Sequence, residues 1–505
     1  MHIRTWVLLT FLLCGLIVTG PLAHAQEAPD PAAADAALDV GESSLDAGDT
    51  ALDAGDSSFD TGEPALDATE RIRLLREKIG GARDEVAELE RKRAARAAAN
   101  ARDEDFQSIW GSYFLATWKD GINLYYLDYG ETDPARRPLH GLSFRGVLQA
   151  GAELYSDKDH PRNDTLSVGA ARLMAEGFFF RSLGYKVEAD LEQDGVTKLK
   201  DGYINLGFVD VAQLRAGHIQ TPIMLEKQKD VRFRNFVELP MIQGIAQLDR
   251  DLGVMVHGDL CCLNYQIGVF NGQAPNTVDD DNPKDLAARI QLTPFGAEGN
   301  EFAEMLGIGA SVTHGHRGTR SKQDGFVPAF QTTSGTTFLA PRGPLGQAGR
   351  LTRAGFEAVF SKGPLAVQAE YVYSRIENLV SGAAGEVDLD VEGVYVDVLY
   401  MLTQEPYPVG GRVRPDHNFD PSRGGLGAFQ VAARYEAVMT ESGFARLTAN
   451  STDRLDAFTL GLNWYLNPQM KLQLNYQRIV FDDDLRLKDI DRNEDLVFFR
   501  LALDF

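Results

Sequence analysis

The 505-residue sequence lacks the features of a disulfide-stabilised protein and of a helical membrane protein. Only three cysteines occur, and two of them, Cys261 and Cys262, are adjacent. A strand would point these two side chains to opposite faces and disfavour a bridge between them. After Val18, no run of about 18 uncharged apolar residues follows. The rest of the chain is therefore not expected to contain a membrane-spanning helix.

Catalytic and nucleotide-binding motifs are also missing. The sequence has no Gly-x-Ser-x-Gly motif and no glycine-rich phosphate loop that precedes a helix. Its formal net charge of −23 disfavours nucleic acid as a partner. We therefore expect neither an enzyme nor a cofactor.

The first 25 residues have the pattern of a cleavable secretory signal. A basic start at Arg4 precedes an apolar run at 6–18, and Ala23-His24-Ala25 fits a cleavage site. The signal peptide predicts export from the cytoplasm.

Residues 26–69 form an acidic, low-complexity segment with a seven-residue repeat, as in "LDAGDTA" followed by "LDAGDSS". The stretch from Gln26 to Glu70 has 13 acidic residues and no basic ones, so it cannot bury enough apolar surface to fold. We interpret it as a disordered spacer. A calcium-binding repeat is the alternative, although known calcium loops place their oxygen ligands more densely.

Residues 70–105 change period. Apolar residues recur at intervals of three and four, which is typical of a short coiled-coil helix: Ile72, Leu75, Ile79, Ala82, Val86 and Leu89. A helix packed against its own domain is the alternative, and Gly80-Gly81 weakens the coiled-coil interpretation. A coiled coil here favours an oligomer, with periplasmic or peptidoglycan contact as a further expectation.

From residue 106 to 505 the chain alternates apolar and polar residues with period two. In the final "LVFFRLALDF", Val497, Phe499 and Leu501 share one side, while Phe498 and Arg500 share the other. About sixteen such segments occur, and short and long connections alternate between them. Many segments have the roughly 9–11 residues that a tilted strand needs to cross a bilayer. The pattern predicts an all-β fold, a 16-stranded antiparallel transmembrane β-barrel, with the C-terminal phenylalanine in an aromatic belt.

An ordered series of segments across 118–505 resembles the phosphate-selective porin O and P family. It includes "GYKVEADL", "LKDGYINLGF", "LRAGHIQTPIMLEK", "RDLGVMVHGD", "LAVQAEYVYSRIE", "VYVDVLYMLTQEP" and "FTLGLNWYLNPQMKLQLNY". The resemblance implies an outer-membrane porin, usually trimeric, whose third long loop folds inward beside an anion path of arginine and lysine. Phosphate-specialised members have tandem arginines where this chain has "GAARL" at 169–173, so only Arg172 matches.

Alternation and the resemblance together give a set of candidate residues for the anion path: Arg145, Arg172, Arg215, Lys227, Arg232, Arg234, Arg289, Arg434 and Arg500. Many of these charges could instead be solvated wall residues or halves of ion pairs. His314-Gly315-His316 is a candidate metal ligand pair, but no third ligand is evident, so no metal site is expected.

The expected function is passive diffusion of small solutes, favouring anions and including phosphate as a candidate, in the outer membrane of a Gram-negative-type cell. The expected partners are lipid, lipopolysaccharide and two further copies of the chain. One alternative is an envelope tether in which the barrel is mainly an anchor. Another is a barrel lipase with its serine and histidine on the lipid-facing rim.

Overall fold

The computed structural model describes residues 106–110, 114–118, 120–126, 139–155, 163–191, 197–246, 249–272, 282–294, 306–316, 330–341, 345–347, 349–381, 385–440, 448–482 and 493–505. The predicted signal peptide (1–25), acidic spacer (26–69) and coiled coil (70–105) lie outside these residues. The account below concerns the region that follows them.

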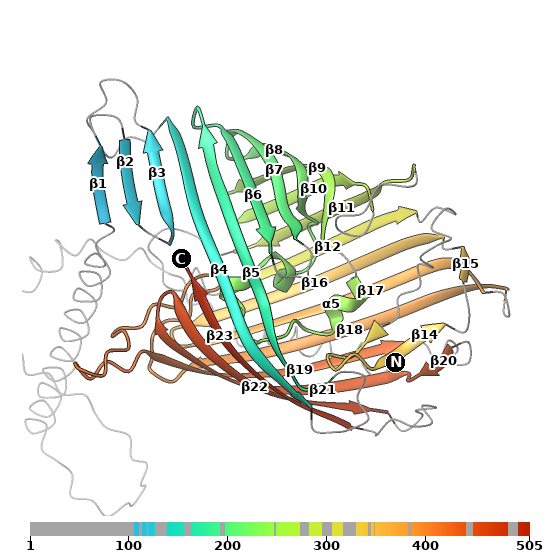
Figure 1. Ribbon diagram of the computed structural model, residues 1–505. Helices are drawn as coiled ribbons and strands as arrows, with labels where there is room; N and C mark the ends of the chain where they lie inside the picture. The colour runs from blue at the N-terminus through green and yellow to red at the C-terminus, as the bar shows by residue number, and fades with distance from the viewer. Residues whose placement is uncertain are drawn as a thin grey trace, which may run out of the picture. The chain divides into compact units, whose positions relative to one another are not determined.

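Sixteen antiparallel strands form a closed barrel (Figure 1). The main sheet has twenty strands, of which β1, β2, β3 and β15 are additions to the wall. The last strand pairs with the first wall strand, from Leu496 opposite Tyr155 to Asp504 opposite Val147, and this pairing closes the ring. The first nine wall strands are β4 (His140–Tyr155), β5 (Thr165–Phe179), β6 (Leu183–Asp190), β7 (Lys198–Val209), β8 (Ala212–Gln220), β9 (Arg250–Leu260), β10 (Leu263–Phe270), β11 (Asp285–Leu292) and β12 (Leu306–His316).

The remaining seven wall strands are longer on average. They are β16 (Arg350–Lys362), β17 (Leu365–Ser381), β18 (Gly385–Met401), β19 (Ala428–Thr440), β21 (Arg454–Asn467), β22 (Met470–Phe481) and β23 (Asn493–Asp504). The sixteen-stranded antiparallel barrel predicted from the alternation is thus confirmed.

The alternation in the sequence sets which side chains face outward. On β23, Phe499 is 46% exposed, whereas the neighbouring Phe498 is 2% exposed. Leu501 and Leu503 are exposed on the same side as Phe499, and Arg500 is buried on the same side as Phe498. Because successive strand side chains point to opposite faces, the apolar set forms the outer surface and the mixed polar set the interior.

Three short strands extend the sheet beside the N-terminal part of β4: β1 (Phe106–Trp110), β2 (Phe114–Trp118) and β3 (Ile122–Tyr126) (Figure 1). β3 pairs with β4 from Tyr126 opposite His140 to Ile122 opposite Phe144. β23 pairs with β4 only from residue 147 onward. β3 therefore pairs with the part of β4 that β23 does not reach, and β2 and β1 continue the sheet outward from β3.

The two rims of the barrel differ in their connections. At one rim, turns of a few residues join β5 to β6, β7 to β8, β9 to β10, β16 to β17 and β21 to β22. Two connections at this rim, 293–305 and 402–427, are longer, as the sequence indicated. Part of the opposite, long-loop rim forms a small separate sheet of β13 (Phe330–Gln331), β14 (Thr337–Pro341) and β20 (Thr448–Ser451), while β15 (Leu345–Gln347) pairs with β17.

The interior is filled partly by chain that folds inward. The largest apolar cluster joins residues of the third long loop, such as Ile242 and Ile245, to inward side chains of β16–β23, such as Val372 and Tyr395. None of the helices in the described residues is both long enough and apolar enough to cross a membrane.

Candidate functional site

The third long loop, residues 221–249, crosses the inside of the barrel and is called the inner loop here. It contains three short helical turns, at α4 (Leu225–Gln228), η1 (Val231–Phe233) and α5 (Ile242–Ala246). The helix α5 lies directly on β18, because a Cβ at Gly393 would come within 2.6 Å of both Ile242 Cγ2 and Ile245 Cδ1. Glycine at this position therefore permits the close approach.

A buried carboxylate holds the start of the inner loop. Glu370 on β17 accepts hydrogen bonds from the backbone N–H of Leu225 (2.5 Å) and of Glu226 (3.0 Å), and from the hydroxyl of Tyr395 (2.6 Å). The side chain of Lys229 then pairs with Glu226 at 2.8 Å. These contacts satisfy backbone donors that would otherwise be buried without partners.

The middle and end of the inner loop are fixed by side chains of β19–β23. The carbonyl of Asn235 accepts hydrogen bonds from Asn463 (2.8 Å) and Gln473 (3.1 Å). Arg500 donates to the carbonyl of Val237 at 2.6 Å. Further anchors are Lys471 to the carbonyls of Arg232 and Arg234, Arg434 to the carbonyl of Glu238, and the Met241 N–H to Glu436. The loop thus lies against the long-strand side of the wall.

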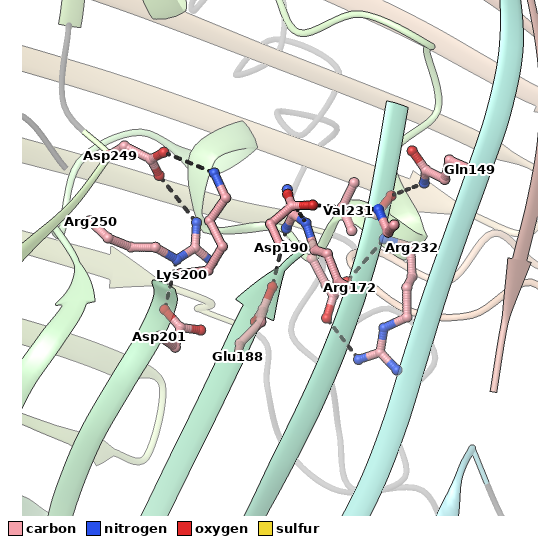
Figure 2. Close-up of polar contacts among 12 residues, drawn as sticks. Gln149, Arg172, Glu188, Asp190, Lys200, Asp201, Val231, Arg232, Asp249 and Arg250 are labelled. Carbon is pink, nitrogen blue, oxygen red and sulfur yellow. Dashed lines mark hydrogen bonds and ion pairs between the residues drawn. The ribbon is translucent and has the colours of Figure 1, made fainter. Parts of the chain in front are cut away.

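On the short-strand side, a continuous row of ion pairs lies along the inner face of β5–β9 and includes Asp249, the last residue of the inner loop (Figure 2). We call it the charge row. Arg172 of β5 bonds Asp190 (3.0 Å) and Glu188 (3.2 Å) of β6. The row continues through Lys186 to Asp201 (2.6 Å), Arg250 to Asp201 (2.7 Å), Arg250 to Asp249 (3.1 Å) and Lys200 to Asp249 (3.7 Å). Its four cations and four carboxylates balance, so the row has no net charge.

Two cations of the inner loop are not held in a direct ion pair with any described residue. Within the part of the chain that the structure describes, Lys227 and Arg234 form no salt bridge. The Nε of Arg234 is buried without a hydrogen-bond partner. Their electrostatic neighbours have both signs: Asp249, Arg250 and Lys200 lie near Lys227, and Arg172, Glu226, Arg500 and Glu238 lie near Arg234. Lys227 and Arg234 therefore place two cations beside the lumen between the inner loop and β5–β9, and no carboxylate of the described residues forms a salt bridge with them.

The electrostatics of these two loop side chains reflect their surroundings. Both are half-buried. Burial lowers the pKa of Lys227 to about 8, with Asp249 opposing the shift and Arg234 adding to it. Burial also lowers the pKa of Arg234 to about 10, and Arg172 lowers it further. Both groups remain mainly protonated at neutral pH, and an anion beside them would favour the charged form.

The nine residues predicted for the anion path separate into two groups in the structure. Three have no carboxylate partner in the described residues: Arg215, Lys227 and Arg234. Arg215 instead donates to Asn205 (3.3 Å) and lies 4.5 Å from the centroid of the Tyr203 ring. The other six pair with carboxylates: Arg145 with Glu176, Arg172 with Glu188 and Asp190, Arg232 with Asp230, Arg289 with Glu357, Arg434 with Asp397, and Arg500 with Glu238.

Sequence reasoning did not identify two members of the charge row. Lys200 and Asp201 are adjacent, so strict alternation would place only one of them inside. Both are buried, because the pairing of β6 with β7 shifts register between Val187 and Ala189. Such an irregularity alters which side chains face the interior, and the sequence gives no sign of it.

Arg412 is a second residue that the alternation did not reveal, because it lies in the connection 402–427. It donates to Asp504 at 2.8 Å and pairs with Asp120 at 3.0 Å. It also lines a small cavity with Arg232 and Lys471. This cavity is at the end of the barrel that carries the short turns.

The other motifs singled out from the sequence lie elsewhere. His314 and His316 are exposed on β12, on the opposite face from the charge row. The described residues contain no group of three or more histidine, cysteine, aspartate or glutamate side chains placed to hold a metal ion. Cys261 and Cys262 are unbridged and form the turn between β9 and β10.

A closed sixteen-stranded barrel with an apolar exterior, charged interior and inward-folded third loop defines an outer-membrane protein of the porin class. A model of the family "Phosphate-selective porin O and P" matches residues 143–505, and the chain belongs to this family. Membership confirms the expectation of a channel protein in the outer membrane rather than an enzyme.

Several known proteins are similar to this chain. Porin O of Pseudomonas aeruginosa is 25% identical over 252 residues, which cover 46% of this chain and 56% of that protein. The chain therefore spans little more than half of this curated relative. In fold, the chain is similar to in-vitro folded OmpT of Vibrio cholerae (TM-score 0.47, 11% identity, 74% of this chain and 99% of that one) and to an anion-selective porin from Comamonas acidovorans (TM-score 0.47, 12% identity, 72% and 100%).

Proposed function

We propose that the barrel passes small anions, including phosphate, by passive diffusion between the inner loop and the inner face of β5–β9. One observation carries the proposal: the charge row is neutral, while Lys227 and Arg234 opposite it are unpaired in the described residues. Fixed charge in a narrow, low-dielectric lumen raises the local concentration of ions of the opposite sign. The selectivity therefore depends on the loop and not on the total number of lumen charges.

Arg215 extends this positive path along β8 toward the turn at residues 210–211. Its guanidinium has no carboxylate partner in the described residues and stacks on Tyr203. A planar guanidinium donates two hydrogen bonds to an oxyanion at once. Arg172, the residue that matches the family's arginine stretch, is engaged by Glu188 and Asp190. We therefore propose passage of small anions in general and no strong preference for phosphate.

We also propose that three copies of the chain associate through the short-strand wall. The strands β6, β8, β10 and β11 have 8 or 9 residues, at or below the roughly 9–11 that cross the hydrocarbon. Their outward side chains are apolar and exposed, among them Val187, Leu214, Ile267 and Leu286. Because these strands are short relative to the hydrocarbon layer, we propose that a neighbouring barrel covers their apolar outer surface more completely than lipid does.

The proposal of anion passage is tested by reversal potentials of the purified protein in planar bilayers under a salt gradient. We expect the double substitution Lys227→Gln, Arg234→Gln to lower the ratio of anion to cation permeability several-fold. The matched control is the double substitution Asp230→Asn, Arg232→Gln, which removes a loop ion pair of 2.7 Å without a change of net charge. The ratio should change little in this control.

Two outcomes would contradict the proposal. An unchanged permeability ratio in the double variant would show that the unpaired loop cations do not set selectivity. The absence of any single-channel conductance in the wild-type protein would favour the alternative function, an envelope tether anchored by its barrel. The extensive packing of the inner loop against β17–β23 makes the conductance measurement the necessary first step.

A further inference from the structure

The outward face of the long-strand wall changes character toward the long-loop rim. On β17 the outward residues run from Val367 through Tyr371 and Tyr373 to Arg375. On β21 they run from Leu460 and Phe458 to charged residues at 456 and 454. The outward residues of β6–β11 named above remain apolar. A polar outer band therefore exists above the apolar belt of the long strands.

Strand length places this band outside the hydrocarbon. β17 and β18 have 17 residues each, whereas a tilted strand needs about 9–11 to cross the apolar layer. Tyrosines mark the boundary, as aromatic side chains do at membrane interfaces. Their hydroxyls donate to carboxylates of the band: Tyr371 to Glu392 (2.9 Å), Tyr373 to Asp390 (2.9 Å), Tyr435 to Asp456 (2.7 Å) and Tyr476 to Asp495 (2.5 Å). The charged side chains therefore lie at the level of the lipid headgroups.

One corner of the band brings several cationic or protonatable groups together. The register places His316 of β12 opposite Arg350 of β16, and His314 opposite Thr352, to which it hydrogen-bonds at 2.9 Å. Arg350 pairs with Glu377 of β17 at 3.0 Å. Beside it, Arg375 pairs with Asp388 at 2.8 Å, and it also lies 3.4 Å from Glu377 and 3.5 Å from Asp390. We call His314, His316, Arg350 and Arg375 the outer corner.

The arginines of the outer corner remain accessible although they are paired. The side chain of Arg350 is 49% exposed and that of Arg375 is 38% exposed. The neighbouring carboxylates hold both guanidinium groups along the outer surface of the barrel. A guanidinium held in this way keeps donors available to a second anion and has lost part of its rotamer freedom beforehand.

We propose that the outer corner binds the phosphate groups of lipopolysaccharide, the phosphorylated glycolipid of the outer leaflet. The long-loop rim is the extracellular rim of such barrels, so the ligand at this level is a phosphorylated headgroup. Arg350 and Arg375 contact the phosphate oxygens directly. The carboxylates of this corner outnumber its arginines, and divalent cations that accompany the lipid phosphates neutralise the surplus. The binding site is separate from the lumen and from anion passage.

The position of the corner argues against a second copy of the chain as the occupant. Burying this many charged groups against another protein would cost more desolvation energy than it returns unless each group found a partner. The short-strand wall offers an uncharged contact surface instead. An anionic, hydrated headgroup requires no such burial.

The test measures binding of deep-rough lipopolysaccharide with phosphorylated lipid A to the purified, delipidated full-length protein, in detergent with Mg²⁺ present. We expect the double substitution Arg350→Gln, Arg375→Gln to weaken binding about tenfold. The same lipopolysaccharide after phosphatase treatment should bind the wild-type protein about as weakly. Inorganic phosphate should compete only poorly, since it lacks the acyl chains that the apolar belt accommodates.

The matched control is Arg478→Gln on β22, which removes an outward arginine of similar exposure, 47%, away from the corner. Its binding should stay close to that of the wild type. An equal loss in this control would overturn the proposal, because it would indicate a general charge effect. Wild-type binding that is insensitive to lipid phosphates, or a change of oligomeric state in the double variant, would also overturn it. The variants Arg350→Lys and Arg375→Lys keep the positive charge but lose the planar guanidinium. An affinity between those of the wild type and the glutamine variant therefore supports the site, even where a glutamine variant folds poorly.

Discussion

The two sides of the barrel wall use the same alternation for different purposes. The strands β6–β11 have 8–12 residues, an apolar outer face and an inner face lined by a charge row. The strands β16–β23 that belong to the wall have 12–17 residues, an outer face that ends in a polar band, and an inner face that holds the inner loop. Alternation therefore specifies which side chains face inward, while the inner loop decides which of them face a pore.

The largest expected effect concerns a buried cation on the long-strand side. Arg434 donates to Asp397 at 2.7 and 2.9 Å and to the carbonyl of Glu238 at 3.1 Å. Its substitution by methionine leaves Asp397 buried and uncompensated, so we expect the free energy of unfolding to fall by about 3–5 kcal/mol. Denaturant unfolding of the refolded barrel in lipid vesicles measures this loss.

Substitution of an arginine by methionine on the short-strand side of the lumen provides the direct comparison. Arg172→Met removes one cation from the charge row, where Lys186 remains 2.8 Å from Glu188. We expect a loss of only about 1–2 kcal/mol, because one of the two carboxylates keeps a partner. Equal losses in the two variants would show that the two sides of the wall do not differ in this respect.

An effect between those of Arg434→Met and Arg172→Met is expected at the first anchor of the inner loop. Glu370→Ala deprives two backbone N–H groups, of Leu225 and Glu226, of their acceptor, and we expect destabilisation by about 2–3 kcal/mol. The control Tyr395→Phe removes the hydroxyl that donates to Glu370 and accepts a long hydrogen bond from Gln368, and it should cost about 1 kcal/mol. Increased current noise in single-channel recordings of Glu370→Ala would report the released loop. A quiet channel of unchanged conductance would contradict the anchoring role.

The sequence predicts most of the wall but only part of the site. Period-two alternation gives the outward and inward faces of β23, and the inward positions of Arg172 and Arg434, because a strand allows no other choice once one face must be apolar. The alternation does not predict which charged side chains form ion pairs. Whether Arg215 or Arg172 meets a carboxylate depends on the register between neighbouring strands, and the alternation of a single strand contains no such information.

The inner loop and the connection 402–427 show the other limit. Their residues have no period, so the sequence identifies Lys227 and Arg234 only as members of a basic loop. Their importance follows from the fold, in which the loop crosses the lumen and leaves these two unpaired among the described residues. Arg412 was not identified for the same reason, since its partners Asp120 and Asp504 are distant in sequence.

The pH dependence of ion selectivity tests whether the charge of Lys227 in the inner loop acts on the permeating ions. The pKa of Lys227 is lowered to about 8, so the lysine is charged below this pH and neutral above it. Between pH 7 and pH 9 its charged fraction falls from about 90% to about 10%, while Arg234, with a pKa of about 10, stays mainly charged. We expect the ratio of anion to cation permeability to fall about two-fold over this range. Lys227→Gln should abolish the fall, and a persistent fall would assign it to another group.

The smallest expected effect concerns the outer band, where a tyrosine can be compared with Tyr395 on the inner face. Tyr435 donates to Asp456 at 2.7 Å, but Arg454 also bonds this carboxylate at 2.8 Å. The phenylalanine variant Tyr435→Phe therefore leaves Asp456 with a partner at a half-buried site on the outer surface, and we expect a loss of about 0.5 kcal/mol with selectivity unchanged. Tyr395→Phe, fully enclosed, should lose about twice as much. Both changes remove one hydroxyl from the same kind of ring, so their losses in the free energy of unfolding can be compared directly. A larger loss at Tyr435 would mean that the polar outer band contributes as much to the stability of the barrel as the buried anchors of the inner loop do.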